Sequence, residues 1–212
     1  MNWLIIILNA LVFIYELRIG NDRNITFIEK YALIPEITSL FGLSNYRFLS
    51  NIFMHGGWLH FISNMWILFI FGDNVEDKMG SLRYLAFYML SGFVASFTHY
   101  ILNMNSPVPA LGASGAIAGV MAAYMFLFPG SKILSFVPIF IIPLFIPIPA
   151  ILFIGIWFII QLFSGTISLL SPGTETGIAF WAHIGGFVAG WVFYKRFLRK
   201  GPKTPKTYYR IQ

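Results

Sequence analysis

Apolar and polar residues follow one another along the chain in long blocks rather than at short intervals. Six apolar runs approach or reach the length of about 20 residues that a membrane-spanning helix needs. They lie near residues 2–18, 54–71, 83–102, 112–128, 148–167 and 179–198. The pattern therefore predicts an all-α polytopic membrane protein, with residues 1–212 forming a single membrane domain of six transmembrane helices.

Two long connections between these runs have their own character. Residues 19–53 mix charged with aromatic and aliphatic residues, so we expect this first loop to lie in the membrane interface. Residues 132–149 are apolar, but they include four prolines, each of which removes a backbone donor. We expect an interfacial or re-entrant loop at 132–149 instead of a continuous helix.

Composition agrees with a membrane protein, and charge suggests an orientation. Hydrophobic residues make up 58% of the chain and charged residues 10%, whereas soluble domains have about 25% charged residues. Seven of the fourteen lysine and arginine residues follow residue 194, which predicts a cytoplasmic basic tail at 199–212. With six spans the N-terminus is also expected to be cytoplasmic, in the plasma membrane. We expect the tail to bind anionic lipid headgroups, and its charge gives no reason to propose nucleic acid.

Four polar side chains interrupt the apolar runs. His60 and Asn64 lie in the second run, Ser114 in the fourth and His183 in the sixth. Polar groups inside a membrane are costly unless they pair or line a cavity. In the expected topology these runs cross in the same direction, and His60, Ser114 and His183 lie near their first residues. We therefore expect these side chains to meet at a similar depth, in a site that opens toward the extracellular side.

A serine beside a histidine points to nucleophilic catalysis. Ser114 becomes a nucleophile if His183 takes its proton, and no carboxylate is obviously placed to orient the imidazole, so we expect a dyad. Because Ser114 begins a helix, backbone N–H groups without intrahelical acceptors lie beside it and can face an oxyanion. His60 and Asn64 are about 40° apart around their helix and could donate to the same oxygen.

Glycines in the fourth and sixth runs predict close helix packing. They follow the small-xxx-small pattern, which lets two helix backbones approach closely. The pairs are Gly115 with Gly119 and Gly186 with Gly190. Such an approach would bring the serine to the histidine.

Taken together, these motifs resemble the rhomboid intramembrane serine proteases in their six-helix prokaryotic form. The residues that carry the resemblance are Gly112-Ala113-Ser114-Gly115, His55 with His60 and Asn64, Glu76 with Gly80, and Ala182-His183-Ile184-Gly185-Gly186 with Gly190. The resemblance implies that Ser114 is the nucleophile and His183 the general base and acid. It also implies oxyanion donors at His60, Asn64 and the Ser114 N–H, and a mobile gate and cap at about residues 148–180.

Other residues are expected to support the site. We expect His55 to make a structural hydrogen bond, and Glu76, near Lys78 and Arg83, to brace loop and helix ends. Tyr46-Arg47 stands in the first loop where many family members have Trp-Arg, a change that keeps an interfacial aromatic.

One departure from the family bears on the histidine. Ala118 stands where some members have a tyrosine that packs on the catalytic histidine. The sequence therefore leaves open which residue holds the ring of His183.

These observations predict an endopeptidase that cleaves in or beside the transmembrane segment of single-span membrane proteins. The expected partners are such substrates and membrane lipids, without a cofactor or metal. Three alternatives compete with the protease. A channel or small transporter should carry charged residues at mid-membrane. A histidine metal site would need closer ligand spacing and a carboxylate. A non-catalytic relative that binds membrane helices should lack Ser114 or His183.

Overall fold

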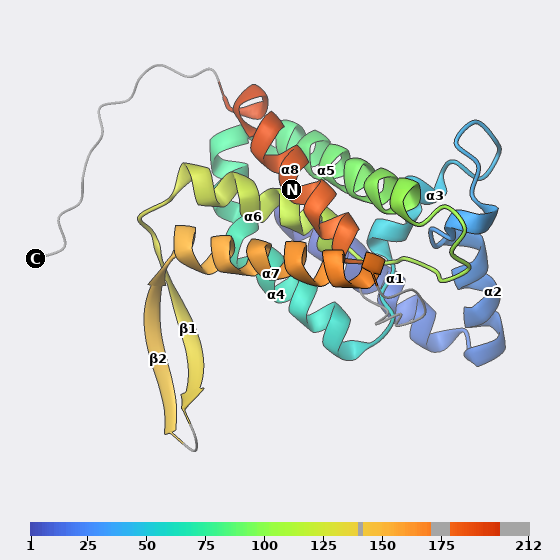
Figure 1. Cartoon of the computed structure of the whole chain (residues 1–212), viewed down its shortest axis with the longest axis horizontal. Coiled ribbons are helices and arrows are strands. Elements are labelled where there is room, and N and C mark those ends of the chain that lie inside the picture. Colours follow the sequence, from blue (N-terminus) through green and yellow to red (C-terminus); the bar gives the residue numbers. More distant parts are fainter. Residues whose placement is uncertain (140–141, 171–178, 200–212) are drawn as a thin grey trace, which may run out of the picture.

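The computed structural model describes residues 1–139, 142–170 and 179–199, and these are mainly helical (Figure 1). The elements are α1 (Asn2–Arg18), α2 (Asn21–Tyr31), η1 (Pro35–Ile37), α3 (Arg47–Ser50), η2 (Asn51–Phe53), α4 (Trp58–Met79), α5 (Ser81–Leu102), α6 (Ser114–Leu127), β1 (Lys132–Ile139), β2 (Ile142–Pro149), α7 (Ala150–Leu170) and α8 (Phe180–Phe197). The predicted helical character is confirmed. The long helices α1, α4, α5, α6, α7 and α8 lie at the six apolar runs.

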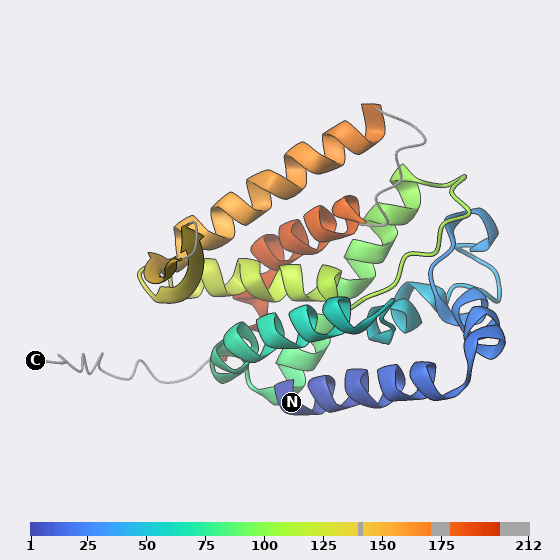
Figure 2. The same ribbon diagram turned by 90° about the horizontal axis from the view of Figure 1, so that it is seen from below.

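Helix α6 occupies the middle of the bundle. Figure 2 shows α7, α8, α6, α4 and α1 following one another from one edge of the molecule to the other, and α6 contacts α4, α5, α7 and α8. Its sequence is rich in glycine and alanine, which lets neighbouring helices approach, and eleven of its fourteen residues are buried. Ser114 is the first residue of this central helix, so its backbone belongs to a well-packed element.

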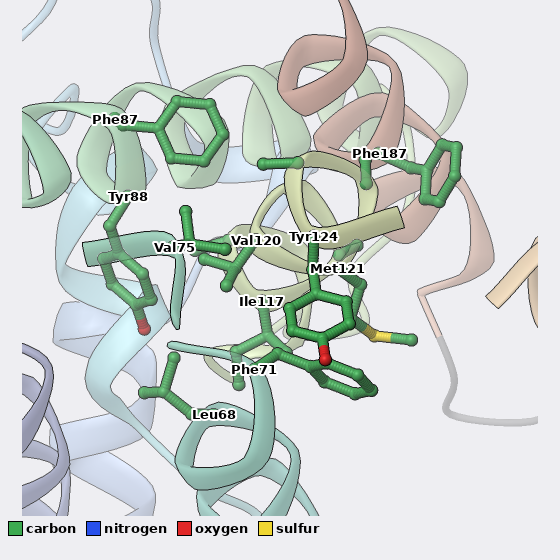
Figure 3. Close-up of a cluster of buried hydrophobic side chains, with 14 of the residues drawn as sticks. Leu68, Phe71, Val75, Phe87, Tyr88, Ile117, Val120, Met121, Tyr124 and Phe187 are labelled. Atoms are coloured by element: carbon green, nitrogen blue, oxygen red, sulfur yellow. The ribbon is translucent and has the colours of Figure 1, made fainter. Parts of the chain in front are cut away.

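The core joins α6 to α4, α5 and α8. Residues 117, 120, 121 and 124 follow the i, i+3, i+4, i+7 spacing of one helix face. The labelled core side chains in Figure 3 are Leu68, Phe71 and Val75 of α4, Phe87 and Tyr88 of α5, Ile117, Val120, Met121 and Tyr124 of α6, and Phe187 of α8. This packing holds the four helices that carry or surround the polar residues.

Residues 132–139 and 142–149 form two paired β-strands, so the expected loop, and with it the purely helical fold, is wrong here. Strands β1 and β2 pair antiparallel, with Pro138 opposite Pro143. Two facing prolines cannot exchange ladder hydrogen bonds, so theirs is a non-hydrogen-bonded pair. By the same register Pro147 and Pro149 fall in pairs of this set, and their missing N–H groups would point away from the partner strand. A two-stranded ribbon therefore accepts the prolines that a helix would not.

The first connection is more ordered than the expected loop. Residues 19–53 contain α2, α3 and two short 3-10 helices. Leu33 and Ala110 exchange backbone hydrogen bonds of 3.0 and 2.8 Å, and the N–H of Gly112 donates to the carbonyl of Asn51 at 2.9 Å. The first connection is thus tied to the segment that leads into α6 and helps to place Ser114.

The helices differ in how well they suit a membrane. By length and composition, two helices among the described residues are long and apolar enough to cross a bilayer, Ser81–Leu102 and Ala150–Leu170. Helix α6 is apolar but has only 14 residues.

Candidate active site

Ser114 and His183 come together although 69 positions separate them in the sequence. Ser114 begins α6, and His183 lies in the first turn of α8. The serine Oγ is 2.8 Å from the imidazole Nε2, a normal distance for a hydroxyl that donates to a ring nitrogen. A serine that serves as a nucleophile needs a base within this distance.

Glycines hold these two helices at this distance. A Cβ built on Gly186 would overlap the carbonyl of Gly115, and one on Gly190 would overlap the backbone of Gly119. A Cβ on Gly119 would lie 3.0 Å from the carbonyl of Gly186. The two backbones touch directly, so the separation of Ser114 and His183 depends on the absence of side chains here.

Helix α7 supplies the residues that hold the imidazole. The Nδ1 of His183 is 2.8 Å from the Oε1 of Gln161. The ring of Trp157 lies beside the imidazole, with centroids 5.8 Å apart and planes inclined by 38°. These two residues contact the imidazole in a chain that has Ala118, which is fully buried, where some family members have a tyrosine.

Sequence reasoning missed Gln161 and Trp157. The expected dyad rested on a search for a carboxylate, whereas the group that meets Nδ1 is a neutral amide. A signal was present, because Gln161 is the only amide or charged residue within Ala150–Leu170. A lone amide in so apolar a helix is a candidate functional residue. No comparable signal distinguishes Trp157 from other aromatic residues of the chain.

His60 and Asn64 lie on the other side of Ser114. Both line the same cavity as Ser114 and His183. Asn64 is buried, and its Nδ2 has no hydrogen-bond partner among the described residues. An amide N–H without a partner, in a residue that lines a cavity, is a candidate donor to a bound oxygen.

Gly112 makes room for the His60 ring. Its φ of 130° is rarely adopted by residues with a side chain. A Cβ at this position would also come within 2.7 Å of the ring atoms of His60. Glycine is therefore required here for two reasons: the backbone turn that leads into Ser114, and the space that the His60 ring occupies.

The cavity has a volume of about 910 Å³ and is partly open to the outside. Its polar wall is formed by His60, Ser63, Asn64, Ser114 and His183. Large apolar side chains form much of the rest, including Trp58, Ile67, Met121, Phe153 and Trp157. An apolar pocket with a few convergent polar groups is typical of a binding site.

His55 supports the site differently from the expectation. Its ring nitrogens are buried and have no partner among the described residues, so no structural hydrogen bond of its side chain is present there. Its backbone N–H donates to Glu16 at 3.2 Å, and its ring packs edge-on to His60, with centroids 5.2 Å apart. His55 thus buttresses His60 through ring contact. Sequence reasoning did not single out Glu16.

Glu76 and Arg47 make contacts away from the cavity. Glu76 accepts hydrogen bonds from the Met1 amino group, the Asn2 N–H and the Ser81 hydroxyl. Through these donors Glu76 braces the ends of α1, α4 and α5. Arg47 donates to the carbonyl of Glu29 at 2.7 Å and ties α3 to α2.

Two expectations fall partly outside the described residues. The basic tail at 199–212 lies there except for Arg199, and so do residues 171–178 of the expected cap.

The family model described as "Rhomboid domain" matches residues 43–200. The chain belongs to the rhomboid family. The match includes all four polar residues of the cavity wall that were expected from the sequence, and it confirms the resemblance inferred from the motifs.

Curated relatives include rhomboid proteins of yeast, plants and mammals. "Rhomboid protein 1, mitochondrial" of Saccharomyces cerevisiae is 27% identical over 183 residues, covering 82% of this chain and 47% of the yeast protein. "RHOMBOID-like protein 5" of Arabidopsis thaliana is 34% identical over 38% of this chain and 26% of the plant protein. "Presenilin-associated rhomboid-like protein, mitochondrial" of Mus musculus is 30% identical over 43% and 25%. The chain thus spans less than half the length of these relatives.

The expected plasma-membrane location, with cytoplasmic termini and an extracellular opening, is contradicted by this comparison. The yeast and mouse relatives are mitochondrial by name, and so is a further Arabidopsis relative, "RHOMBOID-like protein 6, mitochondrial". Basic residues near a span bias its orientation across a membrane. They do not indicate which membrane that is.

Proposed function

We propose that this rhomboid-family chain is a serine endopeptidase that cleaves a peptide bond in or beside a transmembrane segment of another membrane protein. The observation that carries the proposal is the 2.8 Å contact between the Ser114 Oγ and the His183 Nε2 at the wall of a cavity. A paired serine and histidine that only tied two helices together would not need to face a cavity of this volume.

The geometry suggests how the reaction would proceed. His183 Nε2 takes the Ser114 proton while Oγ attacks the carbonyl carbon of the scissile bond. His183 then donates that proton to the leaving amine, and an ester of Ser114 is left. Water attacks the ester with His183 again acting as base, and the carboxylic acid product leaves as Ser114 regains its proton.

An oxyanion forms in both steps, and three donors lie near its expected position. The Ser114 N–H belongs to the first turn of α6, where backbone donors lack intrahelical acceptors. The unpartnered Nδ2 of Asn64 and the ring of His60 approach from α4. Donors held in place before the reaction stabilise the developing charge without reorganising.

The proposed setting is a membrane domain in which α1, α4, α5, α6, α7 and α8 form the six-helix bundle. Helix α6 is about 21 Å long at 1.5 Å per residue, shorter than a hydrocarbon core of about 30 Å. Ser114, at its first residue, would then lie below the membrane surface. The partly open cavity would bring water to it.

Surface side chains support a lipid environment. Phe41 and Leu43 of the first connection are almost fully exposed, at 98% and 99%. Phe136 and Phe145 of the β-hairpin are also exposed, and the hairpin projects from the bundle (Figure 1). Water disfavours such surfaces, so we propose that both segments contact lipid.

The proposed substrates are single-span membrane proteins whose helix unwinds at the cleavage site. Carbonyls within a helix accept hydrogen bonds from their own helix and are shielded from attack. Sites near glycine or other poor helix formers should therefore be cleaved most readily.

A fluorophosphonate probe and a model single-span substrate in liposomes test the proposal. We expect the wild type to be labelled and to cleave, and Ser114→Ala and His183→Ala to do neither while remaining folded. Ser63→Ala is a matched control, because Ser63 lines the same cavity but its hydroxyl bonds back to the carbonyl of His60. Undiminished cleavage by Ser114→Ala would refute the protease, and an unlabelled, inactive wild type would favour a non-catalytic relative.

A further inference from the structure

Gln161 is an unusual residue for the helix that carries it. Helix α7 lies at an edge of the bundle (Figure 2), and only four of its 21 residues are buried. Ile159 and Phe163, two positions to either side of Gln161, are exposed at 64% and 69%, whereas Gln161 is exposed at 8%. The amide is turned away from the outer surface and toward α8.

Trp157, Gln161 and Gly165 follow one another at intervals of four residues, so they share one face of α7. All three meet the first turns of α8. Trp157 lies beside His183, Gln161 bonds to it, and the Gly165 carbonyl accepts a hydrogen bond from Trp181 at 3.1 Å. This face of α7 is therefore fitted to the part of α8 that carries the histidine.

The atoms that meet favour one tautomer of His183. A neutral imidazole carries one N–H, and a carbonyl oxygen can only accept. With Oε1 of Gln161 at 2.8 Å, the proton belongs on Nδ1. Nε2 then has a free lone pair toward Ser114, which is the state that a general base requires.

We propose that Gln161 is a positioning residue that holds His183 in its Nδ1–H tautomer and orients the ring toward Ser114. The inference rests on the proposed protease function and deepens it. The site is then a serine, histidine and glutamine series drawn from three helices, and it is complete only when α7 lies against α8.

A purely structural role for the amide is less well supported. Glutamine can join membrane helices by hydrogen bonds without further purpose. However, α7 and α8 are already joined by the Trp181 to Gly165 hydrogen bond and by the stacked rings of Phe158 and Phe187, 4.0 Å apart. The Gln161 oxygen is directed at the nitrogen opposite the one that faces Ser114, a geometry that helix docking alone does not require.

The chemistry of the site explains an amide in place of a carboxylate. When His183 takes the serine proton it becomes a cation, and its Nδ1–H bond to a carbonyl oxygen strengthens. A carboxylate would stabilise that cation more, but on a lipid-facing helix it would be costly to keep charged. An amide fixes tautomer and orientation without burying a charge.

Two variants of Gln161 distinguish the effect of its hydrogen-bond acceptor from the effect of its side-chain volume. Gln161→Met keeps the length of the side chain but has only a weak sulfur acceptor, and Gln161→Glu keeps an oxygen acceptor. Thr166→Val is the matched control, because it also removes a polar group from α7, but the Thr166 hydroxyl bonds back to the carbonyl of Leu162. We expect Gln161→Met to lower kcat by roughly tenfold, the value of one hydrogen bond.

The split between kcat and KM gives a further expectation. Among the described residues, Gln161 is not part of the cavity wall. KM for the model substrate should therefore change little in Gln161→Met. The kcat of Gln161→Glu should be closer to that of the wild type than the kcat of Gln161→Met is. The kcat of Thr166→Val should match that of the wild type.

Nitrogen NMR of histidine-labelled protein reads the tautomer directly. The chain has only four histidines, and His183→Ala assigns the signal of interest. We expect a protonated Nδ1 and an unprotonated Nε2 in the wild type, and a shift toward Nε2–H in Gln161→Met.

Three results would overturn the proposal: an Nε2–H tautomer in the wild type, kcat of Gln161→Met within twofold of the wild type, or lost activity with an unchanged tautomer. If Gln161→Met does not fold, the wild-type tautomer and the activity of Gln161→Glu still test the proposal. If the wild type is not labelled by a fluorophosphonate, the protease proposal fails, and the tautomer still tests the contact between Gln161 and His183.

Discussion

The two sides of helix α8 are built in different ways. Toward α6 its backbone touches another backbone through glycines, and eleven of the fourteen residues of α6 are buried. Toward α7 the contact is made by side chains, and only four of the 21 residues of α7 are buried. The first contact limits how far Ser114 lies from His183, and by our proposal the second orients the imidazole. The proposed site would thus take its distance from backbone packing and its orientation from side-chain contacts with a helix of which few residues are buried.

Gly186→Ala should show the largest effect, because it acts on the backbone contact. The new methyl group would overlap the carbonyl of Gly115, and neither backbone can move without separating α6 from α8. We expect a loss of about 3 kcal/mol or more in the free energy of unfolding and almost complete loss of probe labelling. Thermal unfolding in detergent measures the first, and fluorophosphonate labelling the second.

Gly155→Ala is the matched control on the other side. A Cβ at Gly155 of α7 would meet nothing within 4 Å. Alanine is favoured over glycine within a helix, so stability should be unchanged or raised by up to about 1 kcal/mol. A Gly186→Ala protein as stable as the wild type would remove the contrast between the two contacts.

Trp157→Ala should have an intermediate effect, mainly on the rate. The ring packs beside His183, and an aromatic pair of this kind contributes about 0.5–1.5 kcal/mol, which corresponds to a roughly two- to tenfold loss in rate. Trp157→Phe should keep most of the rate. Kinetics of labelling by a small fluorophosphonate measure it without dependence on a large substrate.

Trp66→Ala serves as the control for loss of an indole, because Trp66 is exposed on α4 and its ring packs on Phe69. Equal effects of Trp66→Ala and Trp157→Ala would show that the contact with His183 contributes nothing specific.

Gly165→Ala should have the smallest effect. Its Cβ would lie 3.3–3.4 Å from atoms of Ile184, Phe180 and Trp181. The Ile184 methyl group is the far end of a flexible side chain, and the Phe180 Cβ is already at 3.4 Å, the edge of ordinary contact. Better helix propensity offsets part of this crowding, so we expect a change of less than about 1 kcal/mol in unfolding free energy. Thermal unfolding beside Gly186→Ala is the measurement. A loss as large as that of Gly186→Ala would mean that the α7 contact is as rigid as the α6 contact.

Much of the architecture could be predicted because its causes are local in sequence. The apolar runs mark the six long helices, since each run reflects the composition of one segment. The hairpin at 132–149 was missed because prolines exclude a helix but do not by themselves indicate a strand. Its pairing depends on the alternate placement of prolines in two facing strands, which only the register reveals.

The serine and histidine of the candidate site could be predicted, whereas the residues that support them could not. The serine and histidine stood out because polar residues and glycine motifs are rare and costly in apolar helices. The residue that holds the imidazole was left open, because the search for an orienting partner considered only carboxylates. The hydrogen bond expected of the His55 side chain is not found among the described residues, since the partner of a side chain depends on neighbours distant in sequence.

The order of residues alone was enough to place the helices, to select the pair Ser114 and His183, and to indicate the rhomboid family, because hydropathy and motif spacing are properties of single segments. It could not show that Gln161 and Trp157 hold the imidazole. That depends on how α7 is rotated and where it crosses α8, and a thinly packed helix at the edge of the bundle carries no periodic pattern that would reveal either.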